Sequence, residues 1–332
     1  MPQLSKTSSG NNPAGKAPSS KAVARDGKGR RTAYIVASVV IAIILIIVGA
    51  SLYINAAPFR RIIITVDDTS INMDYFLMRT RLAGADPMVM LEQLTNELLI
   101  KVTAPRYVAE ISPEDVDQAL RRIASGEGET ISESEFKEWY RQLLNEIDLS
   151  DSEYRDYIGT FLLGVRLHEY LAERMSTVAE QVHLYVIVVE TYEDAEKIRA
   201  RWEAGEDFAD LAREVSLDEV SGEKGGDLGW LPRGVLVPGF DDIVFNLAIG
   251  DVSEIVPSIA DPMAEVVEYF YYLFMVSEKA DAREVDEDSL QILKAQALDD
   301  WLSAEIKSPK HKIEWNFNSE IYAWINWQLA KE

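Results

Sequence analysis

A thirteen-residue stretch rich in glycine, residues 222–234 ("GEKGGDLGWLPRG"), restricts the local fold more than any other part of the sequence. It holds five glycines and one proline. Glycine adopts positive φ freely and lets another segment approach its backbone closely. The stretch has neither the GK[ST] ending of a P-loop nor a GxGxxG pattern opening a helix, which excludes these phosphate-binding motifs. We therefore expect either a plain surface loop or a tight scaffold that positions the residues just after it.

The composition is that of a folded protein with two or three domains. The chain has 332 residues, of which 47% are hydrophobic and 27% are charged, as in ordinary globular domains. It has three histidines and no cysteine. The lack of cysteine excludes disulfides, thiol nucleophiles, cysteine-based zinc or iron–sulfur sites and a lipid anchor on cysteine. We expect no cofactor and no metal.

Charge is distributed unevenly along the chain. Residues 1–31 carry seven Lys or Arg and one Asp, a net of +6, so residues 32–332 carry −29 of the total of −23. Such an acidic body argues against a nucleic-acid partner, because phosphate contacts need clustered basic side chains. The tail, rich in Ser, Gly, Asn, Pro and Lys, is typical of a disordered segment.

An uncharged span of twenty residues, 34–53, follows the basic tail. About 20 apolar residues are needed to cross a bilayer as a helix. Tyr34 and Tyr53 bracket the span, as aromatic residues do at membrane interfaces,. Arg30 and Arg31 precede it, and basic residues beside a membrane helix favour the cytoplasmic side. We predict a transmembrane helix over 32–54, a cytoplasmic tail and an extracytoplasmic body. A cleaved signal peptide is the alternative, although its apolar core is usually shorter.

The first part of the body, residues 55–178, is predicted to open on a strand-like segment and continue as helices. Asn72, Ser112, Ser132 and Ser150 each stand where a helix N-cap is expected, and the three serines are followed three residues later by Asp or Glu,. His168 lies inside the last of these helices. With no second histidine nearby in sequence, we interpret it as structural.

The pattern changes after residue 178, and residues 179–282 are predicted to form a separate α+β domain. Strands are expected at 183–190, 253–258 and 268–278, and helices at 191–205, 206–215 and 237–247,. The order β-α-α-α-β-β predicts a small mixed sheet with flanking helices. The remaining part, 283–332, contains two amphipathic helices, the first of which we expect to pack against the helices of 55–178.

The run 207–256 resembles the parvulin (PpiC-like) family of peptidyl-prolyl isomerases. The resemblance rests on "F..LA...S.D", "GGDLGW", "F...F" and "G..S..V", all of which lie in this run. The segments "LTNELLIK", "ISPEDVDQAL" and "ALDDWLSAEIK" are similar to the helical parts of extracytoplasmic foldases of the SurA and PrsA type. The last thirty residues carry no such resemblance.

The resemblance implies a set of site residues. The proline ring would bind in an apolar pocket formed by Leu228, Leu236 and Phe240, and the catalytic candidates are Asp218 and Tyr272. Tyr272 stands at one of two positions that the family usually gives to histidine, and Val186 stands at the other.

Two neighbouring polar residues are interpreted differently. His183 is three residues from Val186, so it faces the other side of the same strand and is no simple replacement for the missing histidine. Asp227 is interpreted as a turn residue that binds backbone rather than as a catalyst.

Three functions remain open from the sequence. The resemblance implies an extracytoplasmic peptidyl-prolyl cis-trans isomerase and foldase, anchored in the cell membrane, whose partners are unfolded exported polypeptides with X-Pro bonds. The loss of both histidines favours, as the alternative, a catalytically weak or inactive chaperone that only binds unfolded chains. A purely structural membrane scaffold is the third interpretation, but it leaves the proline pocket unexplained.

Overall fold

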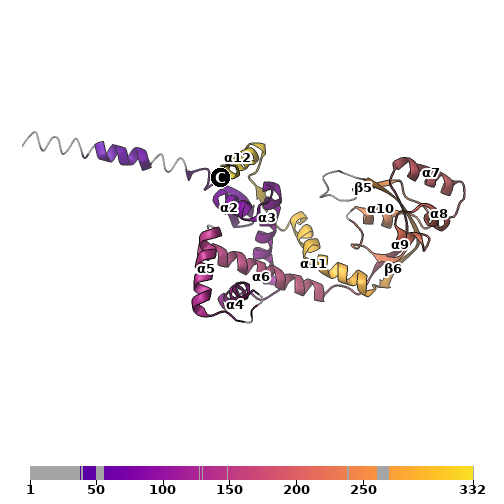
Figure 1. Ribbon diagram of the computed structural model, residues 1–332, viewed down its shortest axis with the longest axis horizontal. Coiled ribbons are helices and arrows are strands. Elements are labelled where there is room, and N and C mark those ends of the chain that lie inside the picture. Colours follow the sequence, from indigo (N-terminus) through magenta and orange to yellow (C-terminus); the bar gives the residue numbers. More distant parts are fainter. Residues whose placement is uncertain are drawn as a thin grey trace, which may run out of the picture. The chain divides into compact units, whose positions relative to one another are not determined.

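The computed structural model divides the chain into two compact units, Met1–Arg60 and Arg61–Glu332 (Figure 1). The described residues are 38, 40–49, 56–126, 128, 130–147, 149–237, 239–259 and 269–331.

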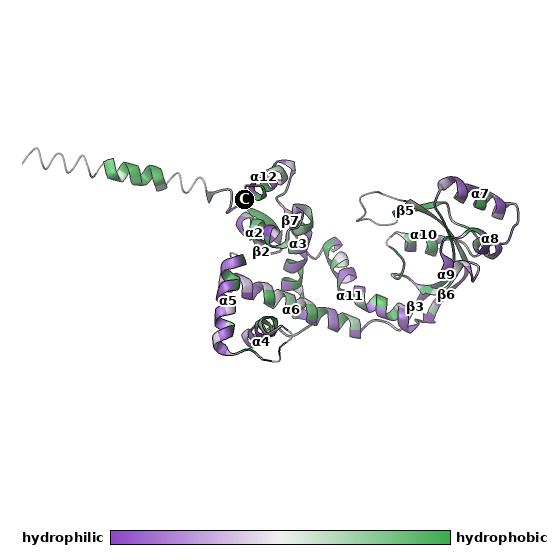
Figure 2. Cartoon of the chain, viewed as in Figure 1, coloured by the Kyte–Doolittle hydropathy of each residue, from purple (hydrophilic) through white to green (hydrophobic). Residues whose placement is uncertain are grey.

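The expected tail, 1–31, lies outside the described residues, as does much of the expected membrane helix, 32–54. Residues 40–49 are helical, and all of them except Gly49 are hydrophobic (Figure 2). Among the described residues, no helix combines the length and the apolar character needed to cross a bilayer.

The first part of the larger unit is a β-hairpin followed by helices. Its elements are β1 (Ile62–Val66), β2 (Thr69–Asn72), α2 (Met73–Ala83), α3 (Pro87–Thr103), η1 (Ala104–Arg106), α4 (Pro113–Ser125), α5 (Glu133–Ile147) and α6 (Asp151–Glu173). The predicted N-caps are confirmed, because the side chains of Asn72, Ser112, Ser132 and Ser150 each accept a hydrogen bond from a backbone N–H three residues later.

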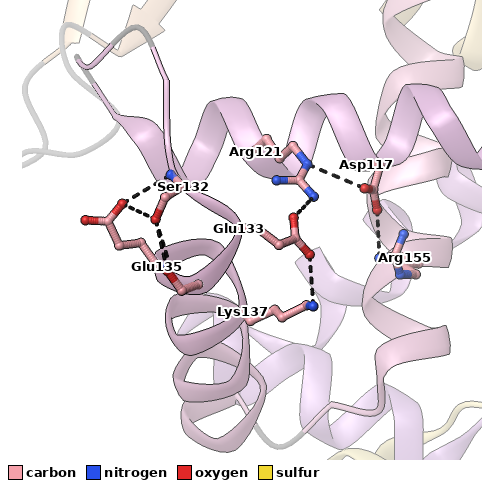
Figure 3. Close-up of polar contacts among 8 residues, drawn as sticks. Asp117, Arg121, Ser132, Glu133, Glu135, Lys137 and Arg155 are labelled. Atoms are coloured by element: carbon pink, nitrogen blue, oxygen red, sulfur yellow. Dashed lines mark hydrogen bonds and ion pairs between the residues drawn. The ribbon is translucent and has the colours of Figure 1, made fainter.

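Ion pairs join α4, α5 and α6 on their solvent side (Figure 3). Arg121 of α4 contacts Glu133 of α5 at 2.6 Å, and Asp117 of α4 contacts Arg155 of α6 at 2.9 Å. Such exposed pairs contribute only about 0–1 kcal/mol each. Stability here comes from the apolar residues beneath them, which include Leu120, Phe136 and Ile158.

The second part contains a four-stranded sheet with the order β4-β3-β6-β5. Its elements are β3 (Val178–Val189), α7 (Tyr192–Glu203), α8 (Phe208–Val215), α9 (Glu219–Gly222), β4 (Asp227–Pro232), α10 (Phe240–Asn246), β5 (Val256–Ile259) and β6 (Tyr269–Glu284).

The prediction of a mixed sheet is wrong, because each of the three pairings in this sheet is antiparallel. A parallel neighbour needs a crossover that returns the chain to the same end of the sheet. Here the glycine-rich stretch itself supplies β4, which runs back along β3 from Tyr185↔Asp227 to Gln181↔Pro232.

The two faces of this sheet bury separate cores. One face packs on α10 and includes Val186, Phe240 and Phe274. The other packs on α7 and α8 and includes Ile187 and Leu211. The period-2 alternation of the strands thus sends adjacent residues to different cores.

The C-terminal residues return to the helical part of the unit. As predicted, α11 (Glu287–Lys307) packs against α6 and α3, and His168 Nε2 lies 2.9 Å from the carbonyl oxygen of Lys294. His168 is therefore structural in this fold. Beyond α11, β7 (Ile313–Trp315) pairs with β1 and α12 (Ser319–Leu329) packs on α2 and α3.

Candidate functional site

The two adjacent glycines of the glycine-rich stretch bring it onto β3, one of the two inner strands of the sheet. Gly226 has φ +82°, and a Cβ at this position would lie 2.5 Å from the carbonyl oxygen of Val186. The Val186 N–H donates to the Gly226 carbonyl at 2.8 Å. Only glycine permits this combination of positive φ and close approach. The stretch is therefore a scaffold attached to β3.

Asp227 shapes the start of β4. Its Oδ1 accepts a hydrogen bond from the Gly229 N–H at 2.7 Å and lies 2.8 Å from His183 Nε2. The backbone contact confirms the interpretation of Asp227 as a turn residue. The His183 ring stacks on Trp230 at 5.4 Å between centroids.

The register between β3 and β4 shifts at Leu228. Leu184 is opposite Gly229 and Tyr185 is opposite Asp227, so Leu228 is the extra residue of a bulge,. Its side chain is 37% exposed.

An aromatic cluster, formed by Phe240, Tyr272 and Phe274 with Leu236 beside it, lies on the α10 face of the sheet. The Phe240 ring centroid is 5.1 Å from that of Tyr272 and 5.0 Å from that of Phe274. These separations are those of favourable aromatic pairs. Tyr272 and Phe274 come from alternate positions of β6, which places both rings on one face.

Asp218 lies beside this aromatic cluster. The Leu217 N–H donates to the Val188 carbonyl at 2.8 Å, and Val188 is opposite Tyr272 in the sheet. Burial, and after it the negative charge of Asp218, raises the pKa of the Tyr272 phenol above its usual value. The Ser221 hydroxyl donates to Asp218 Oδ2 at 2.6 Å and fixes the carboxylate.

The structure thus brings together four of the five predicted site residues. Leu236, Phe240 and Tyr272 pack on one face of the sheet, where Val186 also lies with 3% of its surface exposed. Asp218 follows Leu217, which is hydrogen-bonded to β3 at Val188, opposite Tyr272. Leu228, exposed at its bulge, lines a hollow with Trp230 and Ile292. His183 packs with Tyr185, which belongs to the opposite core, at 5.3 Å between ring centroids.

Two residues of this region were missed from the sequence. Phe274 completes the aromatic cluster, and the alternation within "YFYYLF" was a sufficient signal for it. Asp241 follows Phe240, and its Oδ2 accepts a hydrogen bond from the Gly234 N–H at 2.7 Å. This contact fixes the turn that carries Leu236. No sequence pattern pointed to a contact seven residues back along the chain.

The arrangement combines an apolar surface with one carboxylate and one phenol that keeps its proton. The Ser221 hydroxyl bonded to this carboxylate is buried, and within the described part of the chain no group of three or more His, Asp or Glu side chains is placed to hold a metal ion. Such a surface is suited to binding an apolar ring and acting on a polar group next to it.

Comparison with known proteins gives a family match in this region. The family described as "Rotamase: PPIC-type PPIASE domain" matches residues 188–261. The foldase protein PrsA of Halalkalibacterium halodurans is 28% identical over 261 residues, 74% of this chain and 73% of that protein. That of Geobacillus sp. is 28% identical over 173 residues, 51% of this chain and 52% of that protein. The chain therefore spans only about half of the second relative.

A shorter match reaches higher identity. The foldase protein PrsA of Caldanaerobacter subterraneus is 46% identical over 68 residues, 20% of this chain and 22% of that protein. Among solved structures, PrsA of Bacillus cereus is 17% identical, covers 82% of this chain and 92% of that one, and has a TM-score of 0.36. A TM-score of this size adds nothing to the fold assignment.

Proposed function

We propose that the chain is a parvulin-type, PrsA-like foldase, and that the aromatic cluster with Asp218 is the site at which it isomerises X-Pro bonds of unfolded polypeptides. The observation that carries the proposal is the meeting of Phe240, Tyr272 and Asp218 on one face of the sheet. In this assignment Leu236 and Phe240 hold the proline ring, and Leu228, exposed at its bulge, closes the pocket when substrate binds.

Catalysis of this reaction requires only that the site bind the twisted amide more tightly than the planar amide. Rotation about the amide costs about 18–20 kcal/mol because the C–N bond is partly double, and no covalent bond is made or broken. A site accelerates the rotation by binding the twisted amide more tightly than either planar form.

Each polar group of the site has a role in this scheme. The twisted amide is less charge-separated than the planar one, so the apolar surface around Phe240 favours it. The Asp218 carboxylate, next to the rotating carbonyl, disfavours the planar form with its negative oxygen. The Tyr272 hydroxyl, kept protonated, is the hydrogen-bond donor available to the substrate.

The second candidate function is a chaperone that binds chains without catalysis. One observation favours it. Val186, at the position of a family histidine, is buried and has no polar side-chain atom, so it cannot make the side-chain hydrogen bond of a histidine at this position.

The proposal extends to organisation and location. Residues 179–282 form the isomerase domain. Residues 55–178 and 283–332 form one helical domain that receives unfolded exported chains. Residues 32–54 anchor the protein in the cell membrane, with 1–31 cytoplasmic and the body extracytoplasmic. The anchor is supported by the twenty uncharged residues of 34–53 and by the exposed apolar helix at 40–49.

Refolding of a client whose slow phase is one X-Pro isomerisation tests the catalytic function. The full chain should accelerate that phase, and Asp218→Asn should slow the catalysed rate tenfold or more. Glu219→Gln is the matched control, because Glu219 is the adjacent exposed carboxylate and its loss should leave the rate unchanged. Equal effects of the two variants would remove Asp218 from the site.

A further inference from the structure

The segment 307–331 differs in composition from the rest of this acidic protein. It carries four Lys and two Glu, whereas the whole chain has a net charge of −23. It also holds three of the chain's seven tryptophans, Trp315, Trp324 and Trp327. The isomerase function makes no use of this combination.

The segment is firmly attached to the start of the described body. β7 pairs with β1, and the Asn316 N–H donates to the Ile63 carbonyl at 2.9 Å. Ile321 and Ile325 are the buried residues of α12, which packs on α2 and α3 (Figure 1). One side of α12 is therefore fixed.

The other side of α12 is exposed, and its exposed residues are Ser319, Glu320, Ala323 and Trp327. Ala323, Trp327 and Ala330, spaced four and three residues apart, are all exposed, and we call them the tryptophan face. The Trp327 side chain is 56% exposed. The Lys331 ammonium lies over its ring, 3.2 Å from the centroid. Nearby in sequence, Trp315 of β7 is 49% exposed although its indole N–H donates to Thr95.

Chain length limits the distance between this segment and a membrane anchor. Ile62 follows Tyr53 by nine residues, and nine residues of fully extended chain reach roughly 30 Å. A turn at Phe59, whose N–H donates to the Ala56 carbonyl at 3.2 Å, shortens this reach. An anchor that ends near Tyr53 therefore keeps the start of β1 within roughly 30 Å of the bilayer surface. β7, which pairs with β1, is held close to it as well.

We propose that the tryptophan face of α12 contacts the headgroup region of the bilayer. Tryptophan is enriched at membrane–water interfaces, and basic side chains near the surface are attracted by anionic lipids. Lys331, whose ammonium lies over the Trp327 ring, supplies such a basic side chain at this face. The inference rests on the membrane anchor of the proposed function and adds a second attachment, which restricts rotation of the body about its linker.

Because the chain has no cysteine, one introduced cysteine places a single environment-sensitive fluorophore. Ala323→Cys labels the tryptophan face, and Ala204→Cys, at the exposed C-cap of α7, is the matched control. The full chain is reconstituted into vesicles of phosphatidylcholine and phosphatidylglycerol that carry a lipid quencher at headgroup depth. Flotation of the vesicles reports the anchor independently of the fluorophore.

The expected result is that both labelled chains float, and that lipid quenches the probe at 323 at least twofold while the probe at 204 is unaffected. Trp327→Glu should abolish that quenching, and Trp327→Phe should retain most of it. A floating chain with no quenching at 323, or with equal quenching at both positions, overturns the contact and leaves the anchor standing. Self-quenching between probes at 323 without lipid quenching assigns the face to a second copy instead. A chain that does not float refutes the anchor and the contact together.

Discussion

Replacing Gly226 by alanine tests the close approach of the glycine-rich stretch to β3. Gly226 has φ +82°, and the added methyl would lie 2.5 Å from the Val186 carbonyl oxygen. Gly205→Ala is the control, because Gly205 has φ +99° with no atom within 4 Å of the added Cβ. Placing alanine in a left-handed conformation costs both variants about 1–2 kcal/mol.

The difference between the variants isolates the steric contact. Val186 lies in β3 between β4 and β6 and is 3% exposed, so it has no free direction in which to move. Relief of the contact requires loss of the hydrogen bond from Val186 N–H to Gly226, and an unpaired buried backbone group costs about 1–3 kcal/mol. We expect Gly226→Ala to be about 2 kcal/mol less stable than Gly205→Ala.

Equilibrium unfolding of the full chain in urea, followed by tryptophan fluorescence, measures this difference. With a urea dependence of about 2 kcal/mol per molar, the midpoint of Gly226→Ala should lie about 1 M below that of Gly205→Ala. Equal midpoints would refute the reasoning, because they would show that the stretch yields to a side chain at the contact.

Three further predictions concern the site and the C-terminal attachment. Phe240→Ala removes apolar cover worth about 1.5–3 kcal/mol, so catalysed X-Pro isomerisation should fall about ten- to a hundredfold at temperatures where the variant is folded; an unchanged rate would exclude Phe240 from the pocket. Burial raises the pKa of Asp241, so the folded protein favours the protonated carboxyl and loses stability as this group ionises with rising pH. Asp241→Asn removes the buried charge and should therefore raise the melting temperature at pH 7 but not at pH 3. Hydrogen bonds from the backbone N–H of Lys312 and, as the second cause, from His311 lower the pKa of Asp67 below its usual 3.8. The ionised carboxylate therefore stabilises the fold above that value, and this stabilisation is lost as the pH falls. Amide exchange of 311–316, corrected for intrinsic rates, should accelerate in the wild type below about pH 4, and Asp67→Asn should lack this change.

Short-range signals predicted much of the fold. The N-caps at Ser112 and Ser150 were predictable because a capping box is fixed by residues three apart. The opposite facing of His183 and Val186 was predictable in the same way, because the alternation within one strand decides which face a side chain takes.

The features that the sequence did not reveal depend on contacts between distant segments. β4 was interpreted as a loop because glycine is unfavourable in strands, yet glycine is what allows Gly226 to lie against Val186. The pairing of β7 with β1 joins Trp315 to Ile64, about 250 residues apart, through a strand too short to show a period. The bulge at Leu228 depends on the register between two strands, which no single segment encodes.

Exchange spectroscopy on a proline-containing peptide tests most directly whether the site around Phe240, Tyr272 and Asp218 catalyses isomerisation. Uncatalysed X-Pro exchange takes tens of seconds or more, too slow for cross-peaks between the cis and trans signals. We predict that a catalytic amount of wild-type protein produces these cross-peaks, and that Asp218→Asn weakens them. Absence of cross-peaks with wild-type protein that still prevents aggregation of an unfolded client would contradict the account and identify the protein as a chaperone without isomerase activity.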